Sequence, residues 1–169
     1  MKTLLGTLLN SSTSTSNSII AHYNDIKPPY VTGIRISGDS IFSICPGKVV
    51  DVGKDRNTYV VSILVNSKQM IRYANLRYCD VSSGQDVDFN TYIGKCNKYV
   101  QLEYCTTDKL DSIWPVRVKD ISMFKHDPEG LLTGEVKLNI IVDTQLSDDV
   151  DIYYNNAAMK DELTNNRGE

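Results

Sequence analysis

The feature that most restricts the fold is a series of short apolar runs with a period of two, separated by turn residues, between residues 30 and 106. Residues 59–65 form a long run rich in β-branched side chains, which indicates a strand buried on both faces. Asn66 and Ser67 supply a turn, and the apolar pattern resumes over residues 70–76. We therefore expect these two runs to form a hairpin at the core of a β domain.

Turn residues also divide the rest of this region. Gly38 with Asp39, Pro46 with Gly47, residues 55–57 and residues 82–84 separate further strand-like runs. Strands spaced every eight to twelve residues are typical of an all-β sandwich or barrel. The sequence thus predicts a mainly β fold, with a β-sandwich or hairpin core at residues 30–106.

The N-terminal segment has a different pattern. Leu4, Leu5, Leu8 and Leu9 give a short helix one apolar edge, and such a helix is too short to be stable alone in water. Residues 10–18 are rich in Ser, Thr and Asn and read as a linker. We expect residues 1–29 to be an arm, with the four leucines binding a partner protein.

The C-terminal segment, residues 107–169, is predicted to be an extension of the core. Apolar runs at residues 113–118, 121–124 and 131–142 indicate extra strands, the last with alternating apolar positions. Residues 148–163 are polar with a weak apolar side, which predicts a surface helix, and the remaining residues form a tail.

Composition excludes some classes of partner. The net charge is -3, and the 41% hydrophobic and 23% charged residues are ordinary for a soluble globular protein. Such a balance gives no attraction to nucleic acid. The sequence has no run of 18 apolar residues, so we expect no membrane-spanning helix. The apolar stretch after Met1 is too short for a typical secretory signal, and no cleavage site follows it.

The cysteines carry no metal or redox motif. Cys45, Cys79, Cys96 and Cys105 include no Cys-x-x-Cys pair, and the chain has only two histidines, His22 and His126. Two disulfides are arithmetically possible, but in a domain with a sizeable core we expect reduced thiols that pack as small hydrophobes. Reduced thiols favour synthesis in the host cytoplasm. The lack of a metal or redox motif predicts no cofactor.

The order of motifs in residues 39–103 resembles the lysostaphin-type M23 endopeptidase domain. That family has a first strand ending in a Gly turn, here at Gly53, and then a central Tyr-x-His-Leu, here at residues 73–76. A Val-x-x-Gly-x-x-Val segment leading to Ile-Gly follows at residues 81–94, and the closing His-x-His-x-Glu falls on residues 99–103. The resemblance implies an M23-like β domain at residues 30–106.

The same comparison implies that the zinc site has been lost. The family's His-x-x-x-Asp pair would fall near Pro29 and Gly33, and residues 29–37 contain no His, Asp, Glu or Cys. The other motif positions hold residues that bind zinc poorly or cannot take up a proton near neutral pH, except for one matching carboxylate. These vestigial positions are Asn75, Tyr99, Gln101 and Glu103. We therefore expect no metal and no catalysis.

The expected function is that of a domain that keeps the M23-like fold but lacks the residues for catalysis. M23-like domains occur in bacterial wall enzymes, in division and export regulators with degenerate sites, and in bacteriophage tails. A start without signal peptide or coiled coil favours the phage particle, and the ten tyrosines suit protein interfaces. We expect a non-catalytic structural subunit of a phage virion tail or baseplate, bound to other tail proteins in a symmetric assembly.

Two alternatives stay open at this point. One is an active peptidoglycan endopeptidase whose metal ligands do not align with the motif. The other is a binder of cell-wall peptide or glycan that keeps the old groove, with the vestigial residues as polar contacts. A lipoyl-type barrel is disfavoured because no lysine lies in a tight turn flanked by Met or Ala.

Overall fold

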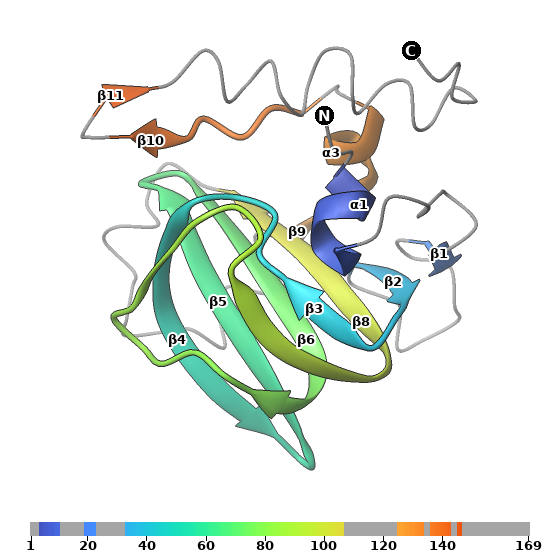
Figure 1. Ribbon diagram of the computed structural model, residues 1–169. Helices are drawn as coiled ribbons and strands as arrows, with labels where there is room; N and C mark the ends of the chain where they lie inside the picture. The colour runs from blue at the N-terminus through green and yellow to red at the C-terminus, as the bar shows by residue number, and fades with distance from the viewer. Residues whose placement is uncertain are drawn as a thin grey trace.

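The main structural feature is an antiparallel sheet with the strand order β1-β2-β8-β6-β5-β4-β7 (Figure 1). The computed structural model describes residues 4–10, 19–22, 33–106, 125–133, 136–142 and 145–146. The strands of this sheet are β1 (Ile19–Ala21), β2 (Ile34–Ser37), β3 (Ser40–Phe42), β4 (Gly47–Asp55), β5 (Thr58–Asn66), β6 (Gln69–Cys79), β7 (Asp86–Val87), β8 (Tyr92–Thr106) and β9 (Lys125–His126). The prediction of a mainly β fold is confirmed.

The longest strand, β8, organises the sheet. One side of it pairs with β6, and the other side pairs in succession with β3 at Tyr92, with β2 at Tyr99 and with β9 at Tyr104. Residues in the middle of β8 therefore lie between β6 on one side and β2 on the other. The vestigial residues 99, 101 and 103 are in this middle stretch.

The central hairpin predicted from residues 59–76 is confirmed. β5 and β6 pair in antiparallel register, with Ile63 opposite Ile71 and Val61 opposite Tyr73. The preceding hairpin joins β4 to β5 through a turn in which Arg56 adopts a positive φ of 60°. The local sequence therefore specified both hairpins, through β-branched runs and turn residues.

The inner face of the sheet carries one hydrophobic core, and the N-terminal helix is part of it. Helix α1 (Leu4–Leu9) lies against this face, with Leu4, Leu5 and Leu8 completely buried and Leu9 packed against the same cluster. β1 adds a further strand beside β2. The expectation that the four leucines of the arm at residues 1–29 bind a partner is therefore corrected, because these side chains already pack on their own domain.

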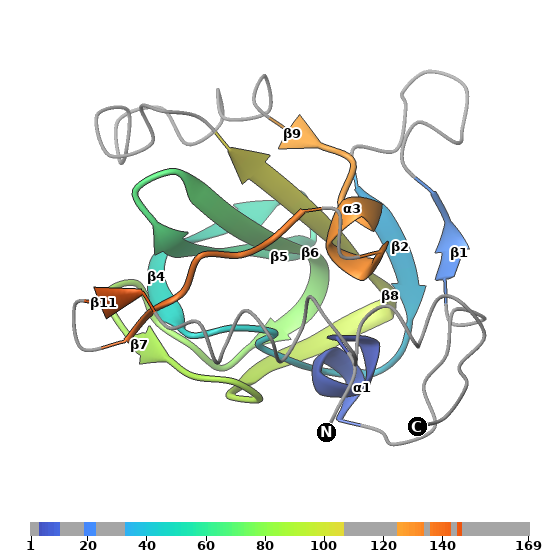
Figure 2. The same cartoon turned by 90° about the horizontal axis from the view of Figure 1, so that it is seen from above.

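The C-terminal part of the chain also covers the inner face, although differently from the prediction. Residues 131–142 are not one strand, because Leu131 lies in helix α3 (Glu129–Thr133) and only Ile141–Val142 forms strand β10, paired with β11 (Gln145–Leu146). The predicted alternation holds, since Leu138 and Ile140 are buried while Lys137 and Asn139 are exposed. Figure 2 shows this orange segment running from the α3 side across the sheet toward the strand labelled β11.

A side chain takes the place of strand pairing for that segment. The amide of Gln69 donates to the carbonyl of Lys137 at 2.7 Å and accepts from the backbone amide of Asn139 at 2.8 Å. Asn66 donates to the carbonyl of Asn139 at 2.7 Å. Two polar side chains from the β5–β6 turn therefore hold residues 137–139 over the core.

Other predictions fall on residues that the structure does not describe. These are the strands at residues 113–118 and 121–124, the helix at residues 148–163, and the linker at residues 11–18. Within the described residues, no helix is long and apolar enough to cross a membrane.

Candidate functional site

The outer face of the sheet carries a row of polar residues across its central strands. The register places Asp51 on β4 opposite Ser62 on β5, Ser62 opposite Arg72 on β6, and Arg72 opposite Glu103 on β8. Ser62 and Glu103 are buried, at 0% and 3% exposure. A buried polar row of this kind costs free energy unless its members pair with one another.

The centre of this row is an ion pair. Arg72 Nη1 lies 3.5 Å from Glu103 Oε1, and the two side chains are only 13% and 4% exposed. Gln101 Nε2 donates to Glu103 Oε2 at 2.6 Å. Partial burial raises the pKa of the Asp51 carboxyl, and the positive charge of Arg72 opposes that rise. The carboxylate of Glu103 thus interacts with Arg72 and Gln101 of its own chain.

A second arginine lies beside the pair, on β2. Arg35 is opposite Gln101 in the ladder, and its Nε donates to Gln101 Oε1 at 3.0 Å. Its Cζ atom lies 4.9 Å from the centre of the Tyr99 ring, a cation–π distance. The motif alignment assigns Tyr99 and Gln101 to the family's closing histidines. In this chain they hold a guanidinium group.

Asn75 has a structural task at its own position. Its φ of 69° lies in the left-handed region, which Asn tolerates better than most residues. The ladder between β6 and β8 is irregular here, because Ala74 faces Gln101 while Leu76 faces Cys96. The Asn75 amide bridges this bulge by donating to the carbonyls of Asn97 at 3.1 Å and Tyr99 at 2.9 Å.

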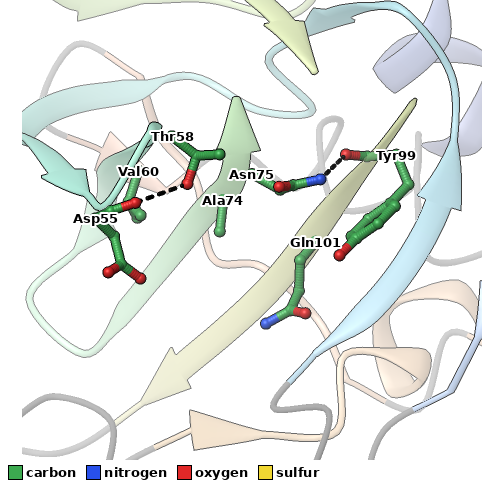
Figure 3. Close-up of a pocket in the computed structure, with 7 residues that line it drawn as sticks. All are labelled: Asp55, Thr58, Val60, Ala74, Asn75, Tyr99 and Gln101. Carbon is green, nitrogen blue, oxygen red and sulfur yellow. Dashed lines mark hydrogen bonds between the residues drawn. The ribbon is translucent and has the colours of Figure 1, made fainter. Parts of the chain in front are cut away.

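An open pocket of about 160 Å³ lies next to these residues (Figure 3). Its lining residues come from β4, β5, β6 and β8 and are Asp55, Thr58, Val60, Ala74, Asn75, Tyr99 and Gln101. The structure therefore brings Asn75, Tyr99 and Gln101 to one pocket. Glu103 does not line the pocket, but its carboxylate accepts a hydrogen bond from Gln101, which does.

The residues present do not fit a zinc ion. The described part of the chain contains no group of three His, Cys, Asp or Glu side chains that could hold a metal. Gly33, the position expected for a ligand, has no room for a side chain, because an added Cβ would lie 2.2 Å from the carbonyl oxygen of Leu102. The guanidinium groups of Arg35 and Arg72 add positive charge where a cation would bind.

The motif alignment missed both arginines and Asp51. A signal was available for Arg35, because it stands between Ile34 and Ile36 in a strand with alternating burial and must therefore face outward. Arg72 likewise interrupts an apolar strand. A charged residue inside such a strand indicates a buried partner, which sequence alone does not identify.

The comparisons with known proteins concern the fold. The sequence matches no protein-family model and no curated protein sequence. Among solved structures, LytU has a TM-score of 0.54 at 15% identity, covering 70% of this chain and 85% of that one. A chain of the SpoIIIAH and SpoIIQ complex has a TM-score of 0.51 at 18% identity, covering 67% and 90%.

The antimicrobial peptidase lysostaphin from Staphylococcus simulans has a TM-score of 0.51 at 16% identity over 66% of this chain. The match covers 47% of the lysostaphin chain. At these identities the comparison shows the architecture and nothing finer. The chain has the fold of M23-type peptidases, as the motif order in residues 39–103 predicted.

Proposed function

We propose that this chain is a non-catalytic binding module on an M23-type scaffold, and that it acts through protein contacts within a multi-subunit assembly. The observation that carries the proposal is the position of Arg35. Its guanidinium is hydrogen-bonded to Gln101 and lies over the ring of Tyr99, the two residues that the motif alignment assigns to the family's closing His-x-His. In this proposal, a cation of the protein stands beside the positions where the peptidase needs its histidines.

The ion pair next to Arg35 supports this reading. A metallopeptidase needs an open metal position and a group that handles protons. In this chain Glu103 is held by Arg72 and Gln101, and the amide of Asn75 bridges backbone carbonyls. Neither side chain is placed to activate water on a metal.

A role in protein contacts is supported by a neighbour in fold. The chain from the SpoIIIAH and SpoIIQ complex, similar over 67% of this sequence, is part of a protein assembly. The fold is thus compatible with a role in protein association, and we propose that role for this chain.

The test for catalysis is a metal and activity assay on the full chain. We expect purified protein to contain no stoichiometric zinc by mass spectrometry and to release no peptides from purified peptidoglycan, with or without added Zn²⁺. Lysostaphin in the same assay is the positive control. Hydrolysis that a chelator abolishes and zinc restores would overturn the proposal.

We further propose that the assembly is a bacteriophage tail or baseplate and that the chain resides in the virion. Its support is the use of M23-type domains on phage tail proteins. The test is quantitative mass spectrometry of gradient-purified particles. A fixed copy number relative to the major tail protein would support the location, whereas recovery only in the soluble lysate would exclude it.

The pocket favours a second candidate, a binder of cell-wall fragments. It keeps an open volume of about 160 Å³ beside Tyr99 and Gln101. In this case the chain would sediment with purified peptidoglycan, and Tyr99→Ala would reduce the bound fraction. Tyr78→Ala is the matched control, because Tyr78 is 48% exposed and does not line the pocket. Equal loss in both variants would point to nonspecific adsorption.

A further inference from the structure

We propose that Arg35 and the adjoining pocket bind a carboxylate group of a partner protein, either its C-terminus or an acidic side chain. This inference rests on the proposed binding function and specifies the chemistry that the site recognises. It depends on the orientation of Arg35, on the absence of an ion-pair partner for it among the described residues, and on the size of the pocket.

Arg35 is held in a fixed orientation. The guanidinium is held on one side by the Tyr99 ring, 4.9 Å from Cζ to the ring centre, and at Nε by the hydrogen bond to Gln101. A guanidinium has five N–H donors, and the Nε bond uses one of them. The two Nη groups make no hydrogen bond to the described residues, and paired Nη donors suit a carboxylate.

The charge of Arg35 has no counter-ion among the described residues. Among the described residues, no carboxylate lies within ion-pair distance of it, whereas Arg72 has Glu103 at 3.5 Å. Arg35 is half-buried on β2, so its charge is less screened than that of a fully exposed arginine. A bound anion would pair with Arg35 in the way that Glu103 pairs with Arg72.

The pocket restricts what that anion can be. Arg35 is not itself a lining residue, but Tyr99 and Gln101 both line the pocket and both contact its side chain, so the pocket and the guanidinium share these two residues. The volume of about 160 Å³ is below the roughly 300–1,000 Å³ of pockets for drug-sized ligands, so it admits one or two small residues. Asp55 lines the pocket, and Glu103 is bonded to Gln101. These negative charges favour a singly charged carboxylate over a phosphate.

The experiment is an NMR titration of the full ¹⁵N-labelled chain. The probes are N-acetyl-Ala-Ala with a free C-terminus, the same dipeptide as its C-terminal amide, and N-acetyl-Ala-Asp-amide with only a side-chain carboxylate. We expect saturable shifts at Tyr99, Gln101 and the Arg35 Nε–H with one or both carboxylate probes, and none with the neutral amide. The stronger of the two carboxylate probes identifies the source of the group.

The variants separate this site from general electrostatics. Arg35→Gln should weaken binding about tenfold or more, the effect of losing a charge-assisted hydrogen-bonded pair. Arg35→Lys keeps the charge without the planar fork, so its affinity should be intermediate. Arg56→Gln, in the exposed β4–β5 turn, makes the same charge change and should alter affinity less than about twofold.

Several results would overturn the inference. These are equal binding of the neutral amide, equal weakening by Arg35→Gln and Arg56→Gln, or tighter binding of inorganic phosphate than of the dipeptide. Thermal denaturation of each variant shows whether it is folded. If Arg35→Gln unfolds, Arg35→Lys still tests whether the planar guanidinium is needed for binding. A chain that lacks zinc and joins its assembly but ignores both carboxylate probes would refute this inference and leave the proposed function standing.

Discussion

Arg72 and Glu103 face each other across β6 and β8 with 3.5 Å between Nη1 and Oε1, and both side chains are almost entirely removed from solvent. Removing one partner of a buried ion pair leaves the other charge without compensation. We expect Glu103→Gln to lower the free energy of unfolding by about 3–5 kcal/mol. Urea denaturation of the purified variant measures this change.

The matched control for this pair is Asp86→Asn. Asp86 pairs with Lys48 at 3.2 Å, but the two side chains are 82% and 56% exposed. An exposed pair contributes at most about 1 kcal/mol, so this variant should differ little from the parent chain. Equal losses in both variants would show that the burial of Arg72 and Glu103 is not what matters.

The second prediction concerns helix α1. Leu8 is completely buried in the sheet core, so we expect Leu8→Ala to destabilise the domain by about 2–5 kcal/mol. Ile20→Ala is the control, because Ile20 is 55% exposed and its truncation should cost less than about 0.5 kcal/mol. Thermal denaturation distinguishes the two. An unchanged melting temperature for Leu8→Ala would show that the helix does not contribute to the core.

The sequence predicted those parts of the fold that local chemistry determines. The β5–β6 hairpin follows from a β-branched run and the turn at Asn66, both contiguous in sequence. The docking of α1 was not predictable in the same way. A leucine edge such as Leu4, Leu5 and Leu8 looks the same whether its partner is another protein or the sheet of its own chain.

The sequence contains a start signal for helix α3, but the apolar alternation after it led to the prediction of a strand. Asp127 Oδ1 accepts from the backbone amide of Glu129 at 2.9 Å, and Pro128 stands at the start of the helix. Asp followed by Pro and Glu is typical of a helix N-terminus. The alternation that begins at Val136 is real, and extending it back to Leu131 produced the incorrect strand.

The sequence named some residues of the candidate site but not the charged ones. The motif order drew attention to Asn75, Tyr99 and Gln101, which line one pocket in the structure, and their role stays a prediction. Arg35 is 66 residues away from Gln101 in sequence, and only the β2–β8 pairing brings them together. Long-range register of this kind has no local signature, so the arginine that occupies the site could not be assigned from the chain alone.

The third prediction tests whether the lost zinc site can be rebuilt. The double variant Tyr99→His and Gln101→His restores the two closing histidines, but residues 29–37 still lack the His and Asp of the other motif, Gly33 has no room for a side chain, and Arg35 remains beside them. Because zinc affinity needs several converging ligands, we expect no stoichiometric zinc in this variant. Metal analysis after dialysis measures it. Zinc bound one to one would show that only the two histidines are missing.

The fourth prediction concerns the tether of residues 137–139. Gln69→Glu keeps the size of the side chain but removes the amide donor that reaches the carbonyl of Lys137 and the Tyr104 hydroxyl. We expect faster hydrogen exchange at residues 137–140 while β5 stays protected. Gln85→Glu is the control, because Gln85 uses its oxygen to accept from the Ser82 amide, and a carboxylate can do the same. Slow exchange in Gln69→Glu would contradict the tether.

The last prediction concerns alkaline pH. Burial raises the pKa of the Cys45 thiol from about 9 to about 12, and burial also raises the pKa of the Tyr73 hydroxyl. The unfolded chain therefore loses these protons at a lower pH than the folded one. Their stabilising contribution is complete below about pH 9, and it is lost as pH rises from there toward 12.

We expect the free energy of unfolding to fall with pH above 9, with Cys45 contributing up to about 1.4 kcal/mol per pH unit. Urea titrations at pH 7, 9.5 and 10.5 give the slope. Cys45→Ala should make the slope shallower although it lowers stability at pH 7, because it removes the titrating group. Val61→Ala, equally buried but not ionisable, should lower stability without changing the slope. Equal slopes for Cys45→Ala and the parent chain would show that the Cys45 thiol is not protected from ionisation by the fold.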